Sequence, residues 1–258
     1  MTEFFNEPTT EQLPHLSLNH EYLPHHFVHV LVPPTAKFNP LIIFIGDGQE
    51  QLHTIPLSRL SAHGFTIAML STDQLTGDLH HQVSEIKSAI RFLLLHAAQF
   101  SIDTNRIFIW GENRGADLSA ITVLTANDPE WNAEDPRVLP LRFRASFLFG
   151  VTDYAKLTAM IPSHKRSALF VYNGELDSFD EACRAQFIKA YRLQNEVQDF
   201  ILRSTASGTS AFYTPYMLTI IEKQIQKKKK KKKIKNFPKR IDTQLKPRYN
   251  TGIDERAL

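Results

Sequence analysis

The stretch RIFIWGENRGADLSAIT, residues 106–122, has the residue types of a turn that presents a reactive side chain. An apolar run ends at Gly111, a polar turn follows, and a helix-like pattern begins after Gly115. In a strand–turn–helix of the form G-x-x-x-G, the middle residue holds its side chain over the edge of the sheet, where it can act as a nucleophile. The middle residue here is Asn113, and an amide is not a usable nucleophile. The spacing therefore predicts the geometry of a nucleophile turn without its attacking atom.

Two roles can be considered for Asn113. Its amide could bind a ligand, or asparagine could occupy this position because it tolerates a positive φ better than most residues. We favour the second interpretation, since the tip of such a turn demands that backbone conformation.

The chain around this turn alternates between strand and helix patterns. Residues 106–110 predict a central strand, and six other segments predict strands: 27–32, 40–46, 65–70, 143–150, 167–174 and 197–203. The first of these stops at a proline pair, which favours an edge strand. Helical spacing of apolar residues predicts helices over 79–100, from the turn to about residue 126, and over 180–194 and 210–230.

This alternation predicts an α/β fold, with a mainly parallel, doubly wound sheet and helices on both faces. The functional crevice of such a sheet lies at the carboxyl ends of its strands. Three of these ends carry glycine and polar residues: 46–49, 111–115 and 174–177.

Charge divides the chain into segments. From residue 222 onwards there are 14 Lys and Arg against 4 Asp and Glu, whereas residues 1–221 hold 16 against 23. We expect a polar leader at 1–24, one domain at 25–226, and a disordered tail at 227–258 that begins with seven lysines and has weak, nonspecific affinity for polyanions. No aromatic residue lies among those lysines, which argues against a specific nucleic-acid module.

Metal and cofactor sites are not expected. Cys183 is the only cysteine, so a Cys/His metal knot is excluded. Histidines at 25, 26, 29, 80 and 81 invite a metal hypothesis, but we expect them to be solvated. The start of the chain lacks the pattern of a secretory signal and no run is long enough for a transmembrane helix, so we expect a cytoplasmic protein.

The segment SEIKSAIRFLLLHAAQFSIDTNRIFIWGENRGADLSA resembles the α/β hydrolases, particularly small esterases of the acetylxylan-esterase-like or acyl-peptidase-like kind. Members tend to show an acidic residue, an A-[VI]-R/x-[FW]-L helix, a D-x-x-R-[IV] strand entry and then G-x-S-x-G-G. The corresponding positions here are Glu85, 89–93, 103–107 and 111–116. The resemblance runs from about residue 27 to 225 and implies an α/β-hydrolase fold without a sizeable cap domain.

The resemblance also implies where a catalytic triad would lie, in the order nucleophile, acid, histidine. Asn113 replaces the nucleophile. Asp177, in the G-x-x-D pattern of 174–177, matches the acid. Ser207, within 204–210, stands where the histidine belongs, and the last histidine of the sequence is His164.

The oxyanion loop of these enzymes often reads H-G-G-G. Here Gly46, Asp47 and Gly48 keep two glycines and add an acid, which would oppose a developing oxyanion. Arg114 follows the turn, and we expect it to form a salt bridge with Asp47 or Asp177, although it could bind an anion instead.

These substitutions predict an esterase-like protein that is inactive or strongly impaired and that binds an ester- or acyl-like small molecule or a protein partner in the old crevice. The alternative is an active ester hydrolase with relocated chemistry, using Ser207 or Ser210 with His53 or His164. A nucleotide-binding domain ranks last, because no segment gives G-x-G-x-x-G before a suitable helix.

Overall fold

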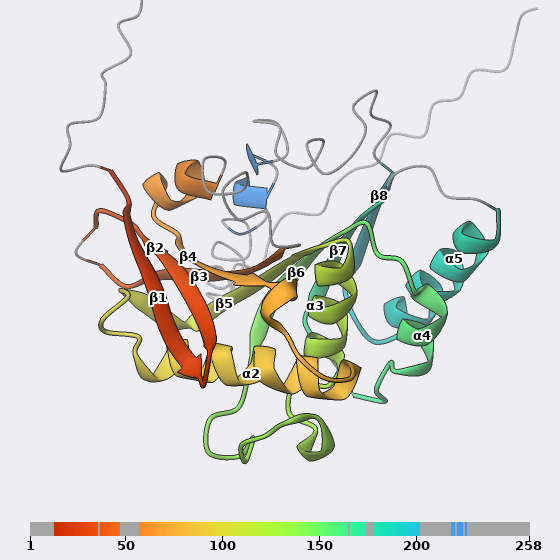
Figure 1. Cartoon of the computed structure of the whole chain (residues 1–258). Helices are drawn as coiled ribbons and strands as arrows, with labels where there is room; N and C mark the ends of the chain where they lie inside the picture. The colour runs from red at the N-terminus through yellow and green to blue at the C-terminus, as the bar shows by residue number, and fades with distance from the viewer. Residues whose placement is uncertain are drawn as a thin grey trace, which may run out of the picture.

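The described strands form one sheet of eight members in the order β1-β2-β4-β3-β5-β6-β7-β8 (Figure 1). The structure is a computed structural model that describes residues 13–35, 37–46, 57–164, 166–173, 178–201, 218–219, 221–223 and 225. The strands are β1 His15–Leu23, β2 His26–Val32, β3 Asn39–Gly46, β4 Thr66–Ser71, β5 Ile102–Glu112, β6 Phe143–Phe149, β7 Ala168–Asn173 and β8 Val197–Ile201. Strands β3 to β8 are parallel, and the β1–β2 hairpin joins β4 in antiparallel fashion. The predicted α/β class is confirmed.

Helices cover both faces of the sheet (Figure 1). Helices α2 (Leu79–Leu95), α3 (Arg114–Leu124), α4 (Tyr154–Ala159) and α5 (Ser178–Arg192) pack on one face. The other face is covered by helical residues 57–62 and by the helical residues between 218 and 225. Each face has its own buried apolar cluster, and the side chains of the central strands alternate between the two.

The beginning of the fold corrects two sequence predictions. Strand β1 lies within the segment 1–24 that was predicted as a polar leader, and it makes β2 an inner strand although 27–32 was predicted as an edge. The reason is exposure: no residue of β1 is fully buried, so its sequence lacks the apolar pattern of a core strand. The predicted tail at 227–258 lies outside the described residues.

Within the described residues, no helix is long and apolar enough to cross a membrane.

Candidate functional site

The turn after β5 has the backbone of a nucleophile elbow. Asn113 has φ 50° and ψ −120° and immediately precedes α3. Its carbonyl accepts the first backbone hydrogen bond of the helix, from the Ala116 N–H at 2.9 Å, and its own N–H donates to the Phe149 carbonyl at 2.8 Å. The predicted positive φ is confirmed. Its side chain is half-buried and makes no capping hydrogen bond to α3.

The glycines that flank this turn are required by close backbone contacts. A Cβ on Gly111 would lie 2.1 Å from the carbonyl oxygen of Gly115, and a Cβ on Gly115 would lie 2.2 Å from the carbonyl oxygen of Ile45 on β3. Neither neighbour can move aside, because both are backbone atoms of packed elements. The elbow therefore depends on β3, β5 and α3 passing at a distance that only glycine permits.

A third glycine, which the sequence did not single out, leaves space for the side chain of Asn113. Gly150 follows β6 with φ 71°, and a Cβ there would lie 2.8 Å from Asn113 Oδ1. The side-chain oxygen thus takes up space that a Cβ on residue 150 would need. Sequence alone could not reveal this pairing, because the two residues meet only through the register of β5 and β6, in which Glu112 pairs with Phe149.

Arg114 is exposed at the first position of α3. Its guanidinium donates to the side-chain oxygen of Gln82 on α2 at 2.9 Å, and the Gln82 amide in turn donates to the Gly77 carbonyl at 2.9 Å. The contact that the structure describes is thus with a neutral partner. Its predicted salt bridge stays a prediction, because Asp47 and Asp177 lie outside the described residues.

One turn further along α3, Asp117 joins the helix to the loop after β6. Its carboxylate accepts hydrogen bonds from the Thr152 N–H at 3.0 Å and from the Thr152 hydroxyl. Burial raises the pKa of Asp117, although these hydrogen bonds oppose the shift. The same loop is tied to β7 by Asn173, whose side-chain oxygen accepts from the Tyr154 hydroxyl at 2.5 Å and whose amide donates to the Val151 carbonyl.

A buried carboxylate lies near the start of α2. Glu85 accepts hydrogen bonds from the Thr76 hydroxyl at 2.7 Å and from its N–H at 3.0 Å. The Nε2 atoms of His26 and His81 lie 3.1 and 3.2 Å from Glu85 Oε1. The expectation of solvated histidines holds for His81, whose side chain is 61% exposed, and is wrong for His26, whose side chain is only 14% exposed beside this carboxylate. The described residues contain no group of three or more side chains placed to hold a metal ion.

The other predicted site residues are only partly covered by the structure. Gly46 is the buried last residue of β3, and it pairs with Ser71 beside the strand that leads to the elbow. Asp47, Gly48, Asp177 and Ser207 lie outside the described residues, so their predicted roles stay predictions. Ser119, a nearby hydroxyl, is fully buried within α3 and has no hydrogen-bond partner among the described residues.

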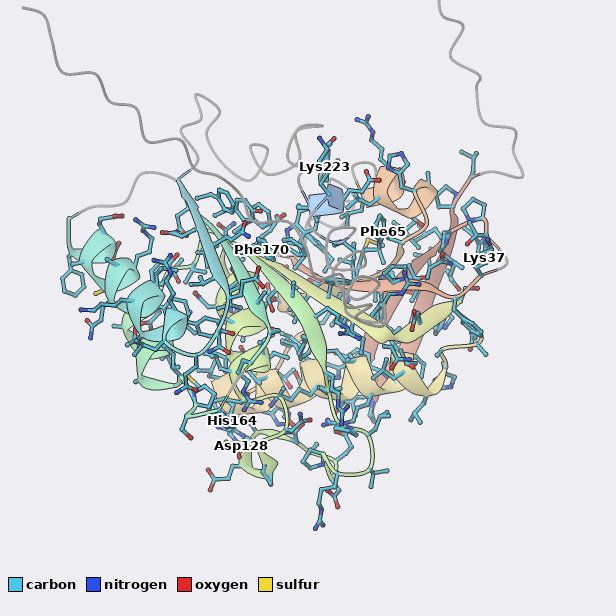
Figure 2. All side chains as sticks on the ribbon, turned by 180° about the vertical axis from the view of Figure 1, so that it is seen from behind. Lys37, Phe65, Asp128, His164, Phe170 and Lys223 are labelled. Carbon is cyan, nitrogen blue, oxygen red and sulfur yellow. The ribbon has the colours of Figure 1, made fainter. Side chains whose placement is uncertain are left out.

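The position of His164 weighs against one form of relocated chemistry. His164 lies four residues before β7, at the amino end of that strand, whereas Asn113 follows the carboxyl end of the parallel strand β5. In the view of Figure 2, His164 and Asp128, which follows α3, lie toward the same end of the molecule. His164 and Asn113 are thus at opposite edges of the sheet. His53, Ser207 and Ser210 lie outside the described residues.

Comparisons with known proteins point to one group of enzymes. The BD-FAE family model matches residues 43–180, which is more than half of the 258 residues. Esterase LipC of Mycobacterium tuberculosis is 37% identical over 111 residues, covering 39% of this chain and 27% of LipC. The chain therefore matches only about a quarter of the length of that curated relative.

Solved structures agree with the fold. Esterase B from Lactobacillus rhamnosis, in complex with a tributyrin phosphonate inhibitor, has a TM-score of 0.66 at 13% identity and covers 89% of this chain and 90% of its own. Thermogutta terrifontis esterase 2, phosphorylated by paraoxon, has a TM-score of 0.63 at 16% identity, with coverage of 83% and 94%. At such identities the likeness concerns the fold alone.

Proposed function

Because this chain belongs to the BD-FAE family and has the fold of α/β-hydrolase esterases, we propose that it is an esterase-like protein that has lost ester hydrolysis and kept a binding crevice. The observation that carries the proposal is Asn113, which has the strained backbone of a nucleophile elbow and no atom that can attack an ester.

The rest of the triad supports the same conclusion. The sequence has no histidine after His164, so the segment that follows β8 supplies no general base in the position where the family has one. Asp47 adds a carboxylate to the oxyanion loop, where a negative charge would oppose the tetrahedral intermediate. A nucleophile, a base and a suitable oxyanion hole would all have to be supplied from elsewhere.

The ligand that we propose is a small ester- or acyl-bearing molecule bound at the carboxyl edge of the sheet. Asn113 is half-buried there, with an amide that can donate to an ester carbonyl and accept from a hydroxyl. Arg114 is exposed beside it at the N-terminus of α3, where a carboxylate or other anionic group of a ligand would be favoured.

Ester turnover tests the loss of catalysis. Purified chain incubated with p-nitrophenyl acetate and p-nitrophenyl butyrate should release p-nitrophenol no faster than its Asn113→Ala variant. Equilibrium dialysis with the intact butyrate ester measures binding separately, and Asn113→Ala should weaken it. Turnover by the parent chain that disappears in Asn113→Ala would show that the elbow still catalyses and would overturn the proposal.

Restoring the missing groups tests whether the scaffold is that of an esterase. We expect the double variant Asn113→Ser, Ser207→His to hydrolyse p-nitrophenyl acetate measurably, and each single variant to remain at background, because nucleophile and base act as a unit. Labelling by a fluorophosphonate should appear only in variants that carry the Asn113→Ser substitution. Labelling of the parent chain at Ser207 or Ser210 would instead establish relocated chemistry.

A further inference from the structure

A hollow of about 1280 Å³ lies at the edge of the sheet opposite Asn113. Its walls come from the first residues of β3, β5, β6 and β7, together with the segment that precedes β8. These are amino ends of parallel strands, whereas the elbow follows a carboxyl end. The hollow, here called the amino-edge groove, is therefore separate from the crevice of the proposed function.

The charged side chains that line the amino-edge groove are mostly cationic. Five carry a positive charge and two, Asp103 and Glu196, carry a negative one; the cationic residues are Lys37, Arg106, Arg144, Arg166 and Arg192. This balance is the reverse of that of residues 1–221, in which acids outnumber bases by 23 to 16. The groove thus concentrates positive charge on a body that is otherwise acidic.

Several of these charges are not neutralised locally. Arg106 is an exception, because it forms a salt bridge with Asp103 at 2.5 Å. Arg144 and Arg192 are exposed, and the salt bridges among the described residues involve neither of them. The Nε atom of Arg166 is buried without a hydrogen-bond partner in that same part of the chain. The Nε atom of Arg144 donates to the Asn105 carbonyl at 2.9 Å, a neutral acceptor that leaves the charge of Arg144 uncompensated. A bound oxyanion would compensate the charges of Arg144 and Arg192 and would accept from Nε of Arg166.

An aromatic side chain lies at the rim. Phe38 is 61% exposed and follows Lys37, and its carbonyl accepts a hydrogen bond from Arg106 at 3.2 Å. Phe65 also lines the groove but is buried, with 4% of its surface exposed; Figure 2 labels Phe65 and Lys37. An exposed ring next to cations is the arrangement that stacks an unpaired base while the cations hold its backbone.

We propose that the amino-edge groove binds a chain of phosphate groups, such as inorganic polyphosphate or single-stranded nucleic acid, without base-specific contacts. The hollow exceeds the roughly 300–1,000 Å³ of a pocket for a small molecule, so an extended ligand fits it better. Ile225 also lines the groove, and in the sequence the run of seven lysines starts two residues after it.

Charge reversal in the groove separates its contribution from that of the lysine run. Binding of fluorescein-labelled (dT)20 and of inorganic polyphosphate to the full chain is measured at low salt, in the native sequence and in a version with Lys227–Lys233 replaced by glutamine. The double variant Arg144→Glu, Arg192→Glu should weaken both ligands by about tenfold or more in either background, and should lower the dependence on salt.

The matched control is the double variant Lys156→Glu, Arg137→Glu, which makes the same change of net charge at exposed positions outside the groove. It should leave both affinities within about twofold, since screening limits the effect of distant charges. If the control weakens binding as much as the groove variant does, or if the glutamine tail abolishes binding and the groove variant changes nothing, the proposal is overturned. Thermal unfolding checks that every variant is folded.

The two phosphate sources are distinguished by Phe38→Ala. Loss of a stacked ring should weaken (dT)20 by about fivefold or more and leave polyphosphate unchanged, because stacking on a base contributes about 1–3 kcal/mol. That result assigns the groove to nucleic acid. If Phe38→Ala changes neither affinity, the groove contacts only the phosphate groups of its ligand.

Discussion

Asn113 adopts a backbone conformation, φ 50° and ψ −120°, that costs roughly 1–3 kcal/mol for most residues. In an active hydrolase that strain serves to present a nucleophile. Here the strained backbone is present without a nucleophile. It is held by the hydrogen bond from the Asn113 N–H to the Phe149 carbonyl, and Gly150 leaves room for Asn113 Oδ1. The strain therefore belongs to the scaffold of β5, β6 and α3, and the identity of the side chain decides only whether the scaffold can react.

Gly150 should be intolerant of even one added carbon. In Gly150→Ala, the new Cβ meets Asn113 Oδ1 at 2.8 Å while the residue keeps φ 71°. We expect a loss of about 2–3 kcal/mol in the free energy of unfolding, from a combination of backbone strain and steric contact. Urea denaturation of the two proteins measures it.

Gly64 supplies the control for that substitution. Its φ is 86°, but the nearest atom to an added Cβ is 3.6 Å away, so Gly64→Ala should cost only the backbone strain, about 1 kcal/mol. In Gly150→Ala combined with Asn113→Ala, part of the extra cost should be recovered, since the contacting oxygen is gone. Equal costs at the two glycines would mean that the Asn113 side chain simply swings away.

At the scale of elements, the elbow depends on how closely α3 crosses β3. Gly115→Ala would bring a Cβ to 2.2 Å from the Ile45 carbonyl, and no rotamer change can relieve a contact between backbone atoms. We expect a loss of at least about 3 kcal/mol, or failure to fold, as judged by urea denaturation and circular dichroism.

Ser119→Ala is the matched substitution in the same helix. Its hydroxyl is fully buried without a hydrogen-bond partner among the described residues, so removing it should leave stability unchanged or raise it by up to about 1 kcal/mol. If both variants of α3 were equally destabilised, the helix itself would be the sensitive feature, rather than its crossing with β3.

Elements with a buried apolar face could be predicted from the sequence, and those without one could not. Strand β3 is buried at every position, and its sequence predicted it within one residue. Strand β1 is exposed along most of its length and was missed, because its place at the edge is secured by pairing with β2. The two glycines of the elbow could be predicted because their spacing is local. The contacts of Gly150 with Asn113, of Gln82 with Arg114 and of Glu85 with His26 could not, since each pair meets through the tertiary fold.

At the scale of the whole molecule, the two edges of the sheet have different chemistry. The carboxyl edge holds a strained turn that lacks a nucleophile, and the amino edge holds a groove that is rich in arginine. Parallel strands separate these ends by the length of a strand, so changes at one edge need not alter binding at the other. The two proposals can therefore succeed or fail independently.

Lys87 couples the stability of the whole fold to pH. Its side chain is fully buried, and its Nζ donates to the Thr125 carbonyl at 2.6 Å, the Thr125 hydroxyl at 2.9 Å and the Trp131 carbonyl at 2.9 Å. These contacts join α2 to the segment after α3. No carboxylate is among the three acceptors, and burial lowers the pKa of Lys87 to about 7, with repulsion from Arg91 acting in the same direction.

The direction of the pH dependence follows from that shift. Between pH 7 and 10.5 the unfolded chain keeps a proton on Lys87 that the folded chain has released, so the free energy of unfolding should rise with pH. From pH 7 to 9.5 we expect the native chain to gain about 2–3 kcal/mol relative to Lys87→Met, which lacks the titrating group. Urea denaturation at half-unit intervals of pH measures the difference.

The range should stop below pH 10, where tyrosines begin to ionise in the unfolded chain while burial holds the pKa of Tyr154, Tyr172 and Tyr191 higher in the fold. Parallel curves for the two proteins would instead mean that the three hydrogen bonds stabilise the ammonium as strongly as burial opposes it.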